Sequence, residues 1–199
     1  MVMAAHLGRE AMGLAAALTL ALGACGPAAQ VQMAGGSSVA ASIGSTNVPV
    51  GVPVSVGSMT LCITAPGRAI IQSVAMHEPT GDIAVEAFAT RPNPFARNLD
   101  GVGNPRSSIV DLDLDLDPAA PAVVSGSCPA DVSAISDGEA AALVELVVQV
   151  VRRSGTDAGA SALDITYEMD GDTRTSVIPV GIWLCQATCP PESESLYRS

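Results

Sequence analysis

The sequence contains no lysine, few aromatic residues and no basic patch. All nine basic residues are arginine, against 20 acidic residues, so the formal net charge is −11. Because an excess of carboxylates repels phosphate, we expect no binding to nucleic acid and no electrostatic attraction to anionic lipids. Aromatic residues make up 3 % of the chain. Any core must therefore be built from aliphatic side chains.

The motifs that mark common catalytic sites are also missing. The sequence has no Gly-x-Ser-x-Gly elbow, no His-Glu-x-x-His and no glycine-rich phosphate loop. His77 is the one histidine beyond the first 25 residues, and it lies beside Glu78 and the turn at Pro79. This position is more typical of an exposed side chain than of a catalytic base. We therefore predict a protein that is not an enzyme and needs no cofactor.

The N-terminal residues have the features of an export signal. Arg9 precedes the uncharged apolar run Ala11–Leu22, which is shorter than the ~20 residues that span a bilayer. The run ends in Leu22-Gly23-Ala24-Cys25, which resembles the lipobox of bacterial lipoproteins. The resemblance implies that residues 1–24 are a signal peptide and that Cys25 carries a lipid anchor. It covers this segment alone and implies a location, not an activity.

The rest of the chain divides into three parts. Residues 26–47 are mostly small and follow no hydrophobic period, so we predict a lipidated, flexible tether over residues 25–47. Residues 48–189 are enough for one core and not for two, which predicts a single domain. The tail 190–199 has two prolines and alternating Glu and Ser. We expect it to be disordered.

The clearest strand pattern is a hairpin near the end of the domain. Residues 162–170 form the clearest stretch, in which apolar and polar residues alternate strictly over the eight residues 163–170, which predicts a half-buried strand. Asp170-Gly171 then favours a tight turn, because this dipeptide tolerates positive φ angles. A returning strand over residues 173–184 would place Ile178 opposite Leu163 on one face.

A valine-rich segment at residues 143–153 precedes the hairpin. Helical spacing can be drawn through its valines, but their β-branched side chains favour a strand. We assign Glu145, Gln149 and Arg153 to the polar face of this strand. The segment before it, residues 131–142, is expected to hold a short helical turn.

The first half of the domain shows the same kind of pattern. The apolar parity changes near Gly57-Ser58, which predicts a bulged strand over residues 52–64. Turn signals separate further strands at 70–77 and 83–90, and we expect residues 91–106 to form a surface crossover. With about seven strands and no helical pattern between them, the sequence predicts an all-β fold. An immunoglobulin-like antiparallel β-sandwich fits best.

Four cysteines follow Cys25, and an even number in an exported domain indicates two disulfides. Three pairings are possible, of which we prefer Cys62–Cys128 with Cys185–Cys189. Copper is the alternative for the second pair. The CxxxCP run at residues 185–190 is similar to the copper-binding motif of thioredoxin-like copper chaperones for cytochrome oxidase assembly. That resemblance implies thiolate ligands with help from a distant histidine.

A second candidate metal site is a run of aspartates that alternate with leucines. In an extended chain their carboxylates would share one face about 7 Å apart and could collect Ca²⁺; the residues are Asp111, Asp113, Asp115 and Asp117. A straight strand keeps them too far apart to surround an ion. We therefore favour an edge strand whose charged face discourages pairing and whose leucines point inward.

These observations predict a membrane-anchored, exported lipoprotein on the extracytoplasmic face of a cell membrane. Its β-sandwich is expected to bind a protein or an envelope polymer, or to support the envelope, without catalysis. Metal handling, with calcium or copper, is the alternative. The sequence does not identify the ligand.

Overall fold

The computed structural model describes residues 28–35, 41–94, 102–112, 114 and 116–189, and it consists almost wholly of strands. The strands are β1 (Val31–Met33), β2 (Ala41–Ser45), β3 (Pro53–Ile63), β4 (Ala69–His77), β5 (Ile83–Pro92), β6 (Ala122–Val124), β7 (Val144–Arg152), β8 (Ala158–Ala160), β9 (Ala162–Met169), β10 (Asp172–Ile178) and β11 (Val180–Leu184). A short helix α1 (Asp137–Ala142) and the 3₁₀ turns η3 (Ile109–Asp111) and η4 (Val132–Ala134) complete the described part. The predicted all-β class is confirmed, with eleven strands in these residues instead of about seven.

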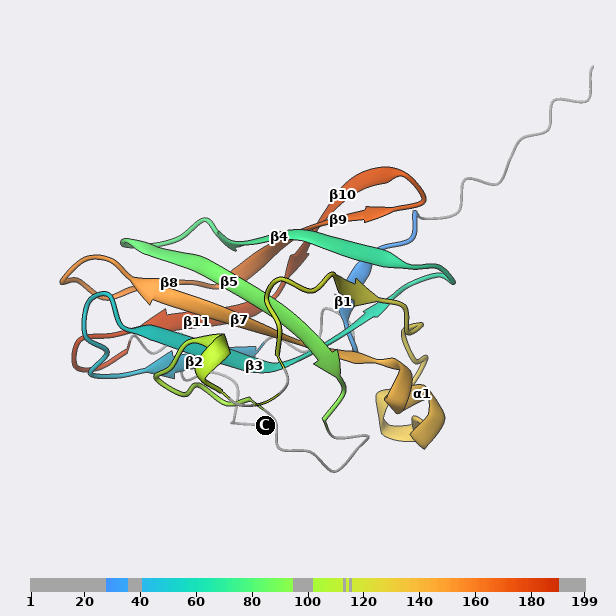
Figure 1. The fold of residues 1–199 in the computed structure, drawn as a ribbon, viewed down its shortest axis with the longest axis horizontal. Helices are drawn as coiled ribbons and strands as arrows, with labels where there is room; N and C mark the ends of the chain where they lie inside the picture. Colours follow the sequence, from blue (N-terminus) through green and yellow to red (C-terminus); the bar gives the residue numbers. More distant parts are fainter. Residues whose placement is uncertain (1–27, 36–40, 95–101, 113, 115, 190–199) are drawn as a thin grey trace, which may run out of the picture.

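The strands form three sheets, ordered β1-β3-β7-β5, β10-β9-β4-β6 and β2-β11-β8. The first two pack face to face (Figure 1). Buried side chains from both sheets form one apolar core between them. The third extends the second sheet, because β8 and β11 continue the β9–β10 hairpin beyond Ser161 and Pro179. All pairings are antiparallel except that of β2 with β11. The molecule is thus a β-sandwich, while the immunoglobulin-like arrangement stays a prediction.

The predicted hairpin is confirmed in position and register. β9 pairs with β10, and Ile178 lies opposite Leu163. Asp170 and Gly171 have φ angles of 55° and 83°, as expected for the two central residues of a tight hairpin turn. The returning strand is interrupted at Pro179, since proline has no N–H for the ladder. Beyond it, β11 joins the third sheet.

The strands predicted over residues 52–64, 70–77, 83–90 and 143–153 are present, and so is the bulge. The pairing of β3 with β7 shifts register between Val56 and Met59, at the predicted Gly57-Ser58 break. β4 and β5 occupy the expected segments. The helical turn expected within residues 131–142 is present as η4 and α1.

The assignment of a solvent face to β7 is wrong for Glu145 and Gln149. Glu145 is fully buried and Gln149 is half-buried, while Arg153 is exposed as expected. The cause is a second apolar cluster on the outer face of the first sheet, where Val102, Ile109 and Leu116 pack against Val147. A loop therefore covers the face that periodicity alone assigns to water.

The predicted tether is wrong where it overlaps two strands. β1 pairs with β3 through Val31 and Ile63, and β2 pairs with β11. Val31 and Met33 are buried in the main core. These segments have no hydrophobic period of their own, and they form strands because they pair with residues that are distant in the sequence. The folded domain therefore includes β1 and β2, which lie before residue 48.

Several predictions concern residues outside the described ranges. These are the signal peptide at 1–24, the anchor residue Cys25, the middle of the crossover at 95–101 and the tail at 190–199. Within the described residues, no helix is long and apolar enough to cross a bilayer.

Candidate functional site

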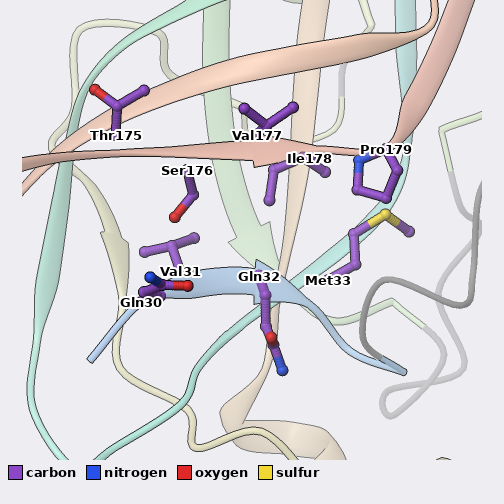
Figure 2. A pocket seen from close by; sticks show the side chains of 9 residues that line it. All are labelled: Gln30, Val31, Gln32, Met33, Thr175, Ser176, Val177, Ile178 and Pro179. Carbon is purple, nitrogen blue, oxygen red and sulfur yellow. The ribbon is translucent and has the colours of Figure 1, made fainter. Parts of the chain in front are cut away.

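A groove lies between two edge strands of the sandwich. It has a volume of about 380 Å³ and is lined by residues 30–33 around β1 and residues 175–179 around β10 (Figure 2). β1 is the last strand of the first sheet, and β10 is the last strand of the second. The groove therefore follows the seam where the two sheets of the sandwich meet.

Side chains hold the two edge strands together along this seam. The hydroxyl of Tyr167, a fully buried residue, accepts a 3.2 Å hydrogen bond from the N–H of Val31 and lies 3.3 Å from Ser176 Oγ. Arg174 Nη1 donates to the carbonyl of Ala29 at 2.9 Å. These contacts tie β1 to the second sheet through side chains. No strand of the described chain pairs with the outer edge of β10.

The lining of the groove is neutral throughout, although the chain carries a net charge of −11. Figure 2 shows Ser176 and Ile178 on the β1 side of strand β10, with Val177 on the other side. Val177 is 52 % exposed, which is unusual for a large apolar side chain in this molecule. The charged residues of β10, Asp172 and Arg174, lie near its start, and the part that lines the groove, from Thr175 to Ile178, contains no charge, proline or bulge of the kind that protects an edge strand. Such an edge can accept a further strand.

A second hollow of about 340 Å³ lies at one end of the sandwich, beside Arg152. This side chain is 3 % exposed and donates to the carbonyls of Val48, Ser154 and Thr156. Its Nε has no hydrogen-bond partner in the described structure. The three carbonyls come from two loops, so Arg152 acts as a clamp between the β2–β3 and β7–β8 connections.

A buried ion pair lies near the other end of β7. Arg91 Nε is 2.6 Å from Glu145 Oε2, and both side chains are shielded from solvent. Glu145 Oε1 accepts hydrogen bonds from the N–H groups of Ser58 and Val102, at 2.7 and 3.1 Å. Gly57 makes the approach possible, because a Cβ there would lie 2.6 Å from Val102 and 2.8 Å from Glu145 Oε1. The cluster fastens the covering loop to the sheet.

Both preferred disulfides are confirmed, as Cys62–Cys128 and Cys185–Cys189. The copper alternative requires two free thiolates at Cys185 and Cys189. In this structure those two sulfurs are bonded to each other, so copper binding there would first need reduction.

The predicted edge strand through the aspartate run is wrong. The chain turns into η3 instead, where the N–H groups of Asp111 and Leu112 donate to the carbonyls of Ser108 and Ile109. The leucines do point inward, since Leu112 and Leu114 pack against the outer cluster that contains Leu116. Asp113 and Asp115 lie outside the described residues. The described residues contain no cluster of potential metal ligands, and calcium binding by the run stays a prediction.

His77 lies at the end of β4 and contacts one carboxylate. Its Nδ1 is 2.9 Å from Asp164 Oδ1 on β9, and about a third of each side chain is exposed. The contact joins neighbouring strands and explains the position of the imidazole without assigning it a reaction.

Sequence reasoning missed the groove, Arg152 and the Arg91–Glu145 pair. A signal for Glu145 was available, because it is a lone acid in a run of valines and leucines, where both faces are often buried. β1 has no comparable signal, since three residues carry no period.

Comparisons of the chain with protein-family models, with curated proteins and with solved structures find no match. The function therefore has to be inferred from the residues and contacts described above.

Proposed function

We propose that this protein is an exported lipoprotein, anchored through Cys25, whose β-sandwich binds a partner without catalysis. The binding site is the groove between β1 and β10, and the ligand is an extended polypeptide segment with neutral side chains. The observation that carries the proposal is the outer edge of β10, with which no strand of the described residues pairs, beside a neutral groove.

The compartment is supported by the cysteines and by the N-terminal motif. Two disulfides use every cysteine after Cys25, and such bonds persist in oxidising compartments outside the cytosol. The lipobox-like Leu22–Cys25 segment accounts for both export and attachment. Two or more acyl chains hold a protein on a membrane, at about 0.8 kcal/mol for each buried methylene.

The nature of the ligand follows from the edge itself. A strand edge offers N–H and C=O groups at a spacing that another polypeptide matches and a polysaccharide does not. The lining carries no charge that would compensate a charged ligand. We therefore favour a protein partner over an envelope polymer, with small or aliphatic side chains opposite Ile178 and Met33.

The anchor is tested by mass spectrometry of the protein extracted from membranes. The expected mature chain begins at Cys25 and carries a diacylglyceryl group, whereas Cys25→Ser should leave residues 1–24 attached. An intact, unacylated wild-type chain would contradict this part of the proposal.

The groove is tested by NMR with a defined probe, a peptide of alternating Thr and Val with Gln at both ends. Binding should shift the amide signals of β1 and β10 in the mature protein. Val177→Glu places a charge at the rim and should weaken binding about tenfold or more. Val110→Glu is the matched control, because Val110 is 70 % exposed and does not line the groove.

Two outcomes would refute the groove as the binding site. One is a set of shifts that avoids β1 and β10. The other is equal affinity for the two valine variants. A probe peptide with proline at alternate positions is the negative control. It lacks the N–H groups needed for a strand ladder and should not bind to the wild type or to either valine variant.

A further inference from the structure

The position of β1 constrains how a lipid-anchored form of this domain can stand on a membrane. Only four residues separate Cys25 from Gln30. Even fully extended, the five peptide steps between these residues reach about 18 Å. The folded domain therefore cannot stand far above a bilayer that holds Cys25.

The chain is fixed to the domain as soon as it reaches Gln30. The N–H of Gln30 donates to Thr64 Oγ1 at 2.8 Å, and the N–H of Thr64 donates to the carbonyl of Gln30 at 2.9 Å. The carbonyl of Ala29 accepts from Arg174. The attachment thus involves β3 in the first sheet and β10 in the second, so the point at which the chain enters the domain is fixed.

These contacts lie at one end of the sandwich. Thr64 directly follows β3, and Arg174 lies just after the β9–β10 turn. Figure 1 places this turn and the blue start of the described chain together, with the β7–β8 loop at the opposite end. β3 spans 11 residues between the two ends, which corresponds to about 35 Å.

We infer that the end of the sandwich with the β3–β4 and β9–β10 turns faces the lipid headgroups, while the Arg152 hollow faces outward. The inference rests on the proposed acylation of Cys25. This end of the sandwich contacts the lipid headgroup layer. The chain between Cys25 and Gln30 is too short for the opposite end of the domain to reach that layer.

Charges of both signs lie near this end. The exposed Arg68 lies after the β3–β4 turn and Arg174 after the β9–β10 turn, beside the exposed Asp170 and Asp172. The exposed Asp137 and Glu139 of α1 lie near this end too, because α1 directly precedes β7, whose Val144 lies opposite Leu61. Acidic groups therefore outnumber basic ones here, and charge does not attract this end to anionic headgroups. The acyl chains supply the attachment and the end of the sandwich only has to be tolerated at the surface.

This orientation also narrows the proposed partner. β1 begins at the end that faces the membrane, where Val31 lies opposite Ile63. The groove between β1 and β10 therefore opens in the half of the domain nearer the bilayer. A segment that binds there has to run close to the membrane, as does the stretch of a polypeptide next to its own membrane anchor.

The test is energy transfer from one tryptophan to a dansyl group on the lipid headgroup. Trp183 is the single tryptophan and is replaced by Phe. Arg68→Trp then reports the inner end and Gln186→Trp the outer end, both at exposed positions. Acylated full-length protein is reconstituted into vesicles of phosphatidylcholine and phosphatidylglycerol. We expect transfer from position 68 to exceed that from position 186 at least threefold.

A linker insertion provides the internal control. Twenty Gly and Ser residues inserted after Gly26 reach about 25 Å on average and should bring transfer from the two positions close together. Circular dichroism checks that each variant keeps the β-sheet signal of the folded protein. If Gln186→Trp loses this signal, Thr188→Trp replaces it as the probe of the outer end.

The outcomes separate the orientation from the anchor. If mass spectrometry finds Cys25 without acyl groups, both the anchor and the orientation are wrong. If Cys25 is acylated but positions 68 and 186 transfer equally, or 186 transfers more, the orientation alone is overturned.

Discussion

The two ends of strand β7 handle a buried charge in opposite ways. At one end, Glu145 meets Arg91 and two backbone N–H groups, so charge is compensated by charge. At the other end, Arg152 meets only backbone carbonyls in the described structure. Removing a charge from water costs several kcal/mol in either case. In both places a buried charged side chain attaches a loop to β7, once with an opposite charge beside it and once with backbone carbonyls as its partners.

The comparison predicts unequal costs for breaking the two sites. Removing one member of a buried ion pair leaves the other charge without its partner, whereas removing a lone cation also removes its own desolvation cost. The Arg91–Glu145 site should therefore be the more sensitive of the two.

The largest effect is expected for Glu145→Ala. It deprives buried Arg91 of its carboxylate and leaves the N–H groups of Ser58 and Val102 without their acceptor. We expect a loss of about 4 kcal/mol in the free energy of unfolding, measured by urea denaturation followed by circular dichroism. Glu145→Gln is the matched control and should lose less, since its amide oxygen can still accept from the two N–H groups. Equal losses for Ala and Gln would show that the hydrogen bonds from Ser58 and Val102 contribute nothing and that the whole loss comes from the charge.

Gly57→Ala should break the same site by crowding it. The added methyl group would lie 2.6 Å from Val102 Cβ and from its carbonyl oxygen, closer than real contacts allow. Because backbone has to move, the cost should lie near the upper end of the range for overpacking, about 3 kcal/mol. Gly155→Ala is the control, since a Cβ there meets nothing within 4 Å. Equal free energies of unfolding for Gly57→Ala and Gly155→Ala would contradict the close contact between the covering loop and the bulge of β3.

Arg152→Met sharpens the comparison from the other end of β7. Methionine keeps much of the aliphatic volume but leaves the carbonyls of Val48, Ser154 and Thr156 without their donor. Unpaired buried carbonyls are costly, while the lost guanidinium no longer has to be desolvated, so the net loss should be about 2 kcal/mol. The same urea titration measures it. A loss greater than that of Glu145→Ala would contradict the order of the two sites.

The sequence predicted local pairings well because their signals are local. Strict alternation and Asp170-Gly171 set the register of Ile178 against Leu163, and a change of parity located the bulge in β3. For the hairpin and the bulge, neighbouring residues contain the information. The even cysteine count predicted two disulfides but left three pairings open, because Cys62 and Cys128 are 66 residues apart.

The sequence could not predict what depends on distant segments. β1 forms because Val31 pairs with Ile63 and donates a hydrogen bond to Tyr167. The residues Val31–Met33 themselves contain no pattern that predicts a strand. Glu145 was assigned to water because the loop carrying Val102 and Ile109 could not be foreseen over the sheet. The groove could not be predicted for the same reason. Each of its walls is an edge strand, and an edge strand can be recognised only when the pairing of the described strands is known.

The smallest effect is expected far from either buried charge, at helix α1. Ser136 and Glu139 form a reciprocal cap, in which Glu139 Oε2 accepts from the N–H of Ser136 at 3.0 Å. α1 buries no side chain, so Ser136→Ala should leave global unfolding unchanged within error and only reduce the helical ¹³Cα shifts of residues 140–142.

Acid should have the same local effect in the wild type. The hydroxyl and the N–H of Ser136 hold the pKa of Glu139 below its ordinary value. A carboxylate with a depressed pKa stabilises the folded form above its unfolded pKa, and this support is lost as the pH falls through the folded pKa. The ¹³Cα shifts should therefore decline in acid for the wild type and much less for Ser136→Ala. A decline of equal size in both proteins would mean that the cap does not hold α1, and that this helix, unlike the buried ends of β7, is maintained by its flanking strand alone.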